Sequence, residues 1–186
     1  MADATEILTT DHRQVEQLFD RYRTSKSATV VREICTELTV HSAVEEKHVY
    51  PSLGSDVDGG KGMRQHAEKE HQQVKDLILE IVRLGYGNPE ADAPMQQIMQ
   101  AVADHVEEEE NDVFPKMRAE LGEERLVTMG EAVTTMKEQL MAEAEKVGPL
   151  VDLTKDELEE LARARAIDGR SSMTKKQLME ALAKVA

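Results

Sequence analysis

The segments HSAVEEKHVYP (residues 41–51) and HVEEEENDVFP (residues 105–115) decide the fold. In both, the inner face of a predicted helix changes from apolar to ionisable side chains, and the pattern of residues is the same. In both segments a histidine precedes a glutamate by four residues, and an aromatic residue followed by proline closes the segment. A spacing of four residues places two side chains about 40° apart on a helix, so both can reach one cation. The pairs His41/Glu45 and His105/Glu109 are therefore candidate metal ligands on two equivalent helices.

Around these segments, apolar residues recur every three or four positions, which predicts amphipathic helices. Pro51 and the glycine-rich stretch at 54–62 are expected to end the second helix. Short connections between the first four helices predict an all-α, up-down four-helix bundle, and a fifth helix without histidine in its stripe is expected to pack on the side or end. The predicted helices cover about 4–23, 28–49, 63–84, 95–113 and 123–146.

Two more histidines lie in apolar stripes, His12 in the first helix and His71 in the third. Burying ionisable side chains costs several kcal/mol each unless they are paired or bind metal. Four imidazoles and two carboxylates suit two iron or manganese ions with bridging carboxylates better than one tetrahedral zinc. The alternative is a buried polar network without metal. Glu109 is predicted to face the site, whereas Glu107, Glu108 and Glu110 are interpreted as a solvated face.

Composition excludes several classes of protein. The net charge of −14 argues against broad binding to nucleic acid or an anionic membrane. With 3% aromatic residues and no Trp, the chain favours helix over strand, which excludes an all-β fold. The single cysteine, Cys35, permits no internal disulfide or Cys-based cluster and is expected to be a core residue rather than a redox group. Without a signal sequence or a long apolar run, a cytoplasmic protein is expected.

A boundary is predicted at Gly148-Pro149, dividing the chain into a metal-binding bundle (1–147) and a small two-helix module (148–186). The last 35 residues are locally neutral, with seven basic and seven acidic side chains. Thr154 and Thr174 each begin a capping-box pattern, which predicts helices over about 155–166 and 175–184. The module has too few apolar residues for a large core of its own.

The segments DHRQVEQLF (11–19), HSAVEEKHVYP, EHQQV (70–74) and HVEEEENDVFP together resemble the hemerythrin, or HHE cation-binding, family over about residues 5–145. This resemblance implies a four-helix bundle around a non-haem di-iron centre that engages dioxygen, peroxide or nitric oxide, with manganese the less favoured metal. Carried over residue by residue, it implies metal ligands at His12, His41, Glu45, His71, His105 and Glu109.

One departure from that family matters for function. Oxygen-carrying members have two histidines four residues apart on the third helix, whereas here Ala67 and Lys75 occupy the positions four before and four after His71. A different or more open metal site is expected, which puts reversible oxygen carriage in doubt and leaves room for peroxide or nitric oxide to bind and react. His48, predicted to face inward above His41, and His66, about 140° around its helix from His71, are candidate additional ligands. His48 could also be a hydrogen-bond partner or proton donor.

Residues 153–182 resemble the small helical modules of the SAP and Rho N-terminal type, some of which bind nucleic acid. Because the segment has no net charge, docking to a protein is at least as plausible for it as binding to nucleic acid. The main hypothesis is a cytoplasmic di-iron protein that binds or reacts with O2, H2O2 or NO during oxidative or nitrosative stress, with enzymatic turnover left open. The alternative is an iron or oxygen sensor that relays metal or redox state through its C-terminal module. Simple storage of iron or oxygen is a third, weaker hypothesis.

Overall fold

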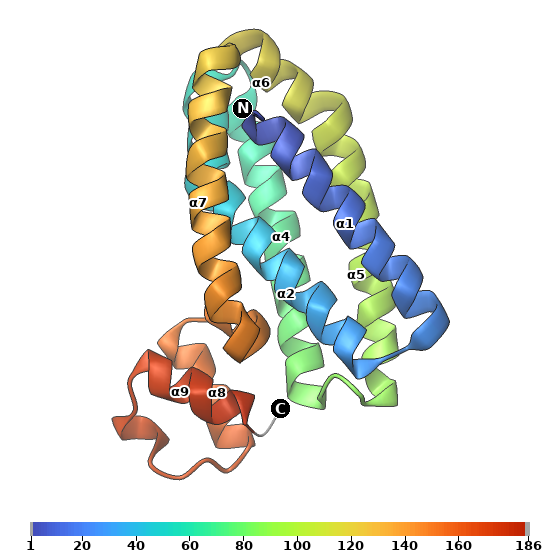
Figure 1. The fold of residues 1–186 in the computed structure, drawn as a ribbon, viewed down its shortest axis with the longest axis vertical. Coiled ribbons are helices and arrows are strands. Elements are labelled where there is room, and N and C mark those ends of the chain that lie inside the picture. The colour runs from blue at the N-terminus through green and yellow to red at the C-terminus, as the bar shows by residue number, and fades with distance from the viewer. Residues whose placement is uncertain (1, 185–186) are drawn as a thin grey trace.

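The computed structural model describes residues 2–184, and helices joined by short turns make up almost all of this range, with no strand in it. Met1, Val185 and Ala186, at the ends of the two predicted segments, lie outside the described residues. Four helical columns run alternately up and down, which confirms the predicted bundle (Figure 1). The columns are α1 (Ala4–Ser25); α2 (Ala28–Val44), η1 (Glu45–Val49) and α3 (Tyr50–Asp56); α4 (Gly60–Leu84); and α5 (Asp92–Glu108), η3 (Glu109–Val113) and α6 (Phe114–Leu121), with the short turn η2 (Pro89–Ala91) before α5.

The fifth long helix, α7 (Glu123–Val147), lies along the side of the bundle against α1 and α2. Its apolar edge is buried there, with Leu126, Met129 and Val133 at most 7% exposed. A Cβ on Gly130 would lie 2.8 Å from the carbonyl oxygen of Ala2, so this glycine lets the start of the chain cross close to α7. The helix therefore covers one face of the four-helix bundle.

The second and fourth columns continue beyond the point predicted from their prolines. The expectation that the second helix stops at Pro51 was wrong, because the column runs on to Asp56 and ends only inside the glycine-rich stretch at 54–62. In each column a five-residue π-helical turn precedes the proline, and its bond runs from the N–H of Tyr50 to the carbonyl of Glu45, or from Phe114 to Glu109. Proline has no N–H and crowds the carbonyl four residues before it. The wider π turn accommodates this conflict without ending the column.

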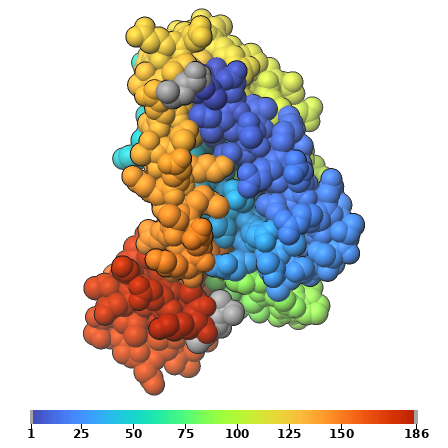
Figure 2. All heavy atoms as spheres, viewed as in Figure 1, coloured from blue at the N-terminus to red at the C-terminus, as the bar shows by residue number. Residues whose placement is uncertain are grey.

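The C-terminal lobe (residues 148–184) consists of η4 (Gly148–Val151), α8 (Lys155–Ala164), η5 (Arg170–Ser172) and α9 (Lys175–Ala183). Both predicted capping boxes are present, at Thr154 and Thr174. Figures 1 and 2 show α8 and α9 gathered at one end of the molecule, below α7. The buried leucines of this lobe join the apolar cluster of the adjoining half of the bundle, so the lobe is docked on the bundle. The division into two domains at residue 147 stays a prediction.

Two apolar clusters fill the bundle, one on each side of a polar layer. On α1 Leu8 belongs to one cluster and Val15 to the other, and His12 lies between them. The other three columns repeat this order, for example Val44 and Leu38 on either side of His41. Within residues 2–184, no helix is both long and apolar enough to span a bilayer.

Candidate metal centre

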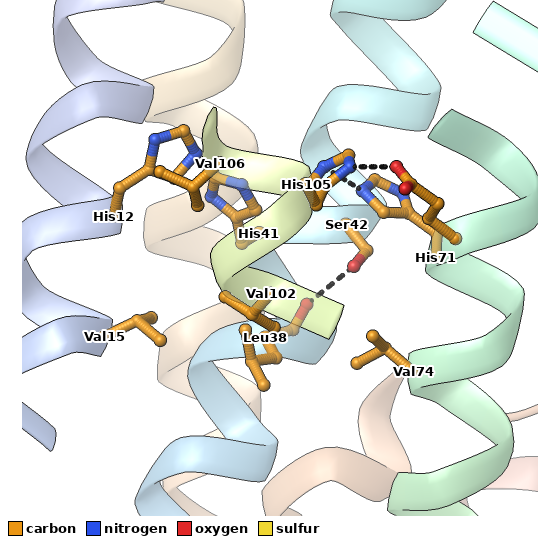
Figure 3. Close-up of a pocket in the computed structure, with 11 residues that line it drawn as sticks. His12, Val15, Leu38, His41, Ser42, His71, Val74, Val102, His105 and Val106 are labelled. Carbon is orange, nitrogen blue, oxygen red and sulfur yellow. Dashed lines mark hydrogen bonds and ion pairs between the residues drawn. The ribbon is translucent and has the colours of Figure 1, made fainter. Parts of the chain in front are cut away.

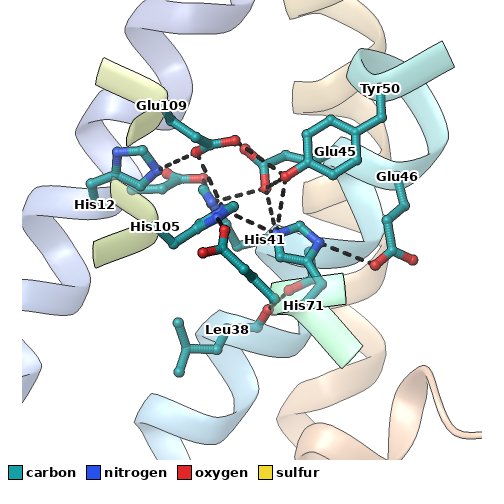
Figure 4. Close-up of polar contacts among 12 residues, drawn as sticks. His12, Leu38, His41, Glu45, Glu46, Tyr50, His71, His105 and Glu109 are labelled. Carbon is teal, nitrogen blue, oxygen red and sulfur yellow. Dashed lines mark hydrogen bonds and ion pairs between the residues drawn. The ribbon is translucent and has the colours of Figure 1, made fainter. Parts of the chain in front are cut away.

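Six ionisable side chains form the polar layer, and all are buried, with no more than 7% of any residue exposed. Each column contributes a histidine, and the second and fourth columns add a glutamate at the first residue of their π turns. Figure 4 shows these side chains converging between the helices. The structure thus brings together the six residues that the sequence predicted as ligands: His12, His41, Glu45, His71, His105 and Glu109.

The two glutamates lie between the histidines and contact them through the Nε2 atoms. Oε2 of Glu45 is 3.2 Å from Nε2 of His41 and 3.3 Å from Nε2 of His71. Oε2 of Glu109 is 3.3 Å from Nε2 of His12 and 3.6 Å from Nε2 of His105. Ligand atoms lie within 4.8 Å of one another in two groups that share Glu45: one is His12, His41, Glu45 and Glu109, and the other is Glu45, His71 and His105.

Every histidine of the layer also has a carboxylate beside its outer nitrogen, Nδ1. These acids adjoin the predicted ligands in sequence, and each reaches across to the histidine of a different column, so that together they link all four columns in a ring. At His12, His71 and His105 the carboxylate is within hydrogen-bond distance of Nδ1, so it keeps the proton on that nitrogen and aims Nε2 into the bundle. The pairs are His12–Glu110 at 2.8 Å, His71–Glu46 at 3.1 Å, His105–Glu70 at 2.7 Å and His41–Asp11 at 3.7 Å.

With neutral imidazoles, the form that binds metal, this arrangement leaves the layer rich in acceptors and poor in donors. Once Nδ1 of each imidazole carries a proton, its Nε2 is an acceptor that faces carboxylates and other imidazoles; Nε2 of His71 lies 3.2 Å from Nε2 of His105. The Tyr50 hydroxyl can donate to Nε2 of His71, at 3.1 Å, or to Glu109. Nε2 of His12, Oε1 of Glu45 and Oε2 of Glu109 have no hydrogen-bond partner. Buried acceptors of this kind need positive charge, so the donor set fits metal cations.

Protons and metal ions compete for the same positions. Burial lowers the pKa of His41, but the carboxylates of Glu45 and Asp11 more than offset this effect and raise the pKa to about 10. The pKa of His71 rises to about 9 for the same reason, through Glu45 and Glu46. Burial raises the pKa of Glu45, but His41 and His71 outweigh it and hold that pKa well below its usual range. The layer therefore favours cations strongly.

A small cavity lies beside the four histidines (Figure 3). Its volume is about 20 Å³, whereas a single water needs about 10–15 Å³ on the same scale. It can therefore hold a diatomic molecule or a peroxide, but little more. The rest of its wall is mainly apolar, formed by Val15, Leu38, Val74, Val102 and Val106.

The two candidate additional ligands lie outside the layer. His48 is half-buried and faces α7, in a shallow groove with Thr135 and Met136. The prediction that it lies above His41 assumed a regular α-helix, and the π turn between them changes the register. His66 has 55% of its side chain exposed and contacts acids on the outer face of α4.

The carboxylates at Nδ1 were not predicted as part of the site. Glu110, interpreted as part of a solvated face, in fact pairs with His12 and has only 22% of its side chain exposed. The signal was present in the sequence, because Asp11, Glu46, Glu70 and Glu110 each adjoin a predicted ligand. Tyr50 also belongs to the layer, whereas the hydroxyl of Tyr22 donates to Asp92 in another part of the bundle.

The fold and the polar layer define a class of protein, the four-helix bundles with a buried metal site between their helices. Residues 3–117 match the hemerythrin HHE cation-binding domain, so the chain belongs to this family.

Two relatives are similar over about two thirds of this chain. One is a DNA nickase from Nostoc sp. (strain PCC 7120), 29% identical over 124 residues, which are 64% of this chain and 35% of the nickase. The other is an uncharacterized hemerythrin-like protein from Schizosaccharomyces pombe, 25% identical over 132 residues, which are 68% of this chain and 65% of that protein. The chain therefore spans less than two thirds of the length of either relative. No solved structure matches it significantly.

Proposed function

We propose that the polar layer holds two iron ions and that the protein binds or reacts with dioxygen, peroxide or nitric oxide, as part of a cytoplasmic response to oxidative or nitrosative stress. One observation carries this proposal: four histidines that meet at two shared carboxylates also line an apolar cavity of diatomic size. The family supports a metal cation, and the nitrogen and oxygen donors favour iron, with manganese as the second choice.

Bound iron would supply Lewis acidity and electrons for small oxygen or nitrogen species. The surrounding residues have separate tasks. Apolar side chains such as Val74 and Val102 keep bulk water from the cavity. The Tyr50 hydroxyl is buried among Glu45, His71 and Glu109, where it can donate a hydrogen bond.

Reaction is favoured over reversible carriage because the third column supplies one histidine to the layer. Oxygen carriers of this family have a second histidine four residues away, and here those two positions are Ala67, which is buried in the neighbouring apolar cluster, and Lys75, whose Nζ donates to Glu46. The methyl group of Ala67 cannot bind metal, so a coordination position is open to a small ligand. Decomposition of peroxide needs no outside reductant, since two molecules of hydrogen peroxide yield two of water and one of dioxygen.

The test measures iron content and the absorption spectrum of the purified protein before and after adding peroxide or nitric oxide. We expect two irons per chain and a charge-transfer band that responds to at least one of these ligands. Glu45→Ala and Glu109→Ala should each lose iron, whereas Glu107→Ala, which removes an exposed acid near the same helix end, should retain it. Full iron content in both Glu45→Ala and Glu109→Ala would disprove the assignment.

A second candidate function, sensing of metal or redox state, is favoured by a chain of contacts to the C-terminal lobe. Glu46, which holds Nδ1 of His71, also accepts hydrogen bonds of 2.8 and 2.9 Å from Lys75. Nζ of Lys75 is 3.6 Å from a carboxylate oxygen of Asp152, in the lobe. A change at His71 could therefore alter how the lobe is held.

The sensor candidate predicts that a partner binds differently to the metal-free and iron-loaded forms of the full chain. Binding to a labelled DNA duplex should be measured for both forms, because one relative is a DNA nickase, and co-purifying proteins should be compared between the two forms. Asp152→Asn should retain iron and lose the difference between the forms. Equal binding by both forms of the wild type would exclude sensing by this route.

A further inference from the structure

A second cluster of metal-ligand side chains lies outside the polar layer, on the outer face of α4 and α5. His66 and Glu70 are four residues apart on α4, and Glu108 lies at the end of α5. Nε2 of His66 is 3.3 Å from Oε1 of Glu70 and 3.2 Å from Oε2 of Glu108. The three ligand atoms lie within 4.8 Å of one another. This surface trio repeats the layer's own pattern, a histidine and a glutamate one turn apart with an acid from the next helix.

The surface trio contacts the polar layer through one of its side chains, Glu70. While Oε1 of Glu70 faces His66, Oε2 of the same carboxylate is 2.7 Å from Nδ1 of His105. The exposed fraction of the side chain falls from 55% at His66 to 23% at Glu70 and 9% at His105. A single contact, between Glu70 and His105, therefore joins the more exposed cluster of ligands to the buried one.

We propose that His66, Glu70 and Glu108 form a third metal site, which takes up a hydrated divalent cation such as Fe2+ or Mn2+ from solvent and delivers it to the polar layer. The delivery step rests on the proposed function; the surface site itself does not. One imidazole and two carboxylates match the donor preferences of these ions and leave coordination positions to exchangeable water. The net charge of −14 further raises the local concentration of cations.

Binding at the surface trio is tested by titrating the purified, iron-loaded protein with Mn2+ and following the loss of the free-ion signal by electron paramagnetic resonance. We expect one site per chain in addition to the buried irons. His66→Ala and Glu108→Gln should each weaken it by about tenfold or more. Glu107→Gln makes the same charge change at the adjacent exposed residue and should leave it intact. Absence of this site, or equal affinity in all four proteins, would overturn the proposal; the trio would then be an ion pair of imidazolium and carboxylates.

Delivery is tested separately by adding Fe2+ to the metal-free protein without oxygen and sampling the bound iron over time with a colorimetric chelator. We expect His66→Ala and Glu108→Gln to load several-fold more slowly than the wild type and Glu107→Gln, yet to reach the same final iron content. Equal loading rates in all four proteins would overturn delivery. If the wild type takes up no iron at the polar layer, the proposed function fails, whereas Mn2+ binding to the metal-free protein still decides whether the surface site exists.

Discussion

At the scale of single residues, Glu110 decides how His12 faces the polar layer. Its Oε1 lies 2.8 Å from Nδ1 of His12, and its other oxygen pairs with Arg13. We expect Glu110→Ala to lower iron affinity about 10- to 100-fold, because the imidazole loses the partner that fixes its tautomer and orientation. Competition with a coloured chelator measures this affinity. Glu107→Ala serves as the control, and an unchanged affinity in Glu110→Ala would show that packing alone orients His12.

The raised pKa values of His41 and His71 predict a pH dependence. These values, about 10 and about 9, exceed the ordinary histidine pKa of 6.5, which applies to the unfolded chain. Proton binding to the two imidazoles therefore stabilises the metal-free protein fully below pH 6.5. That stabilisation is lost as the pH rises through 9 and 10. Metal must displace the same protons, so its affinity increases over this window. The gap in Tm between iron-loaded and metal-free protein should widen from pH 6.5 to 9 in calorimetry; a constant gap would contradict these pKa values.

Cys35 is predicted to be chemically silent in the folded protein. The residue is fully buried, and burial raises the pKa of its thiol to about 12. Because the thiolate is the reactive form, a thiol reagent at pH 8 should modify almost none of the native protein. In guanidinium chloride the same reagent should modify one thiol per chain. Rapid modification of the native protein would instead make a redox role for Cys35 worth testing.

The sequence predicted which residues meet in the polar layer better than it predicted what surrounds them. The ligands follow helical spacing within one element, as with His41 and Glu45, so periodicity finds them. The Nδ1 carboxylates act across helices: Glu46 follows a ligand of the second column but contacts the histidine of the third. Such a partner depends on how the columns are rotated against one another, which periodicity does not specify.

At the scale of elements, each π turn determines which way the side chains point in the part of its column that follows the polar layer. The turn at Glu45–Val49 precedes Tyr50 and Leu53, and both of these side chains are completely buried. Deleting the exposed Lys47 should restore an ordinary helix and rotate these side chains by about 100° relative to Glu45. We expect the deletion to lose metal and to unfold at markedly lower temperature, as measured by circular dichroism. Lys47→Ala keeps the chain length and should match the wild type; a deletion that keeps its metal would show that the π turn is dispensable.

Helix ends illustrate the same limit on prediction. The capping boxes at Thr154 and Thr174 were readable from sequence, because each is a local exchange of hydrogen bonds over four residues. The continuation of the second column beyond Pro51 was not. Proline normally signals a boundary, and only the π turn, which has no distinct sequence signature, allows the column to run on to Asp56.

At the scale of the whole molecule, the polar layer divides the hydrophobic core, and the C-terminal lobe contributes to one of the two halves. Leu158 and Leu161 of α8 belong to the same buried cluster as Val82 of the bundle. The guanidinium of Arg165 donates to the carbonyl of Val82 at 2.7 Å, and Arg83 pairs with Glu160. The lobe's helices were predictable from the sequence, but this docking was not, because the few apolar residues of the lobe form a core only together with those of the bundle.

Docking of the lobe predicts that its core and that of the bundle unfold together. Leu158 is fully buried, so Leu158→Ala should cost about 2–5 kcal/mol of unfolding free energy. In a chain of this size, that cost lowers Tm by roughly 5–15 °C. Scanning calorimetry should show one transition, moved as a whole, whereas Arg163→Ala, an exposed change on the same helix, should leave it in place. If the main transition stayed fixed and a small one appeared below it, the lobe would be a separate folding unit, and a contact such as Lys75–Asp152 could break without disturbing the polar layer.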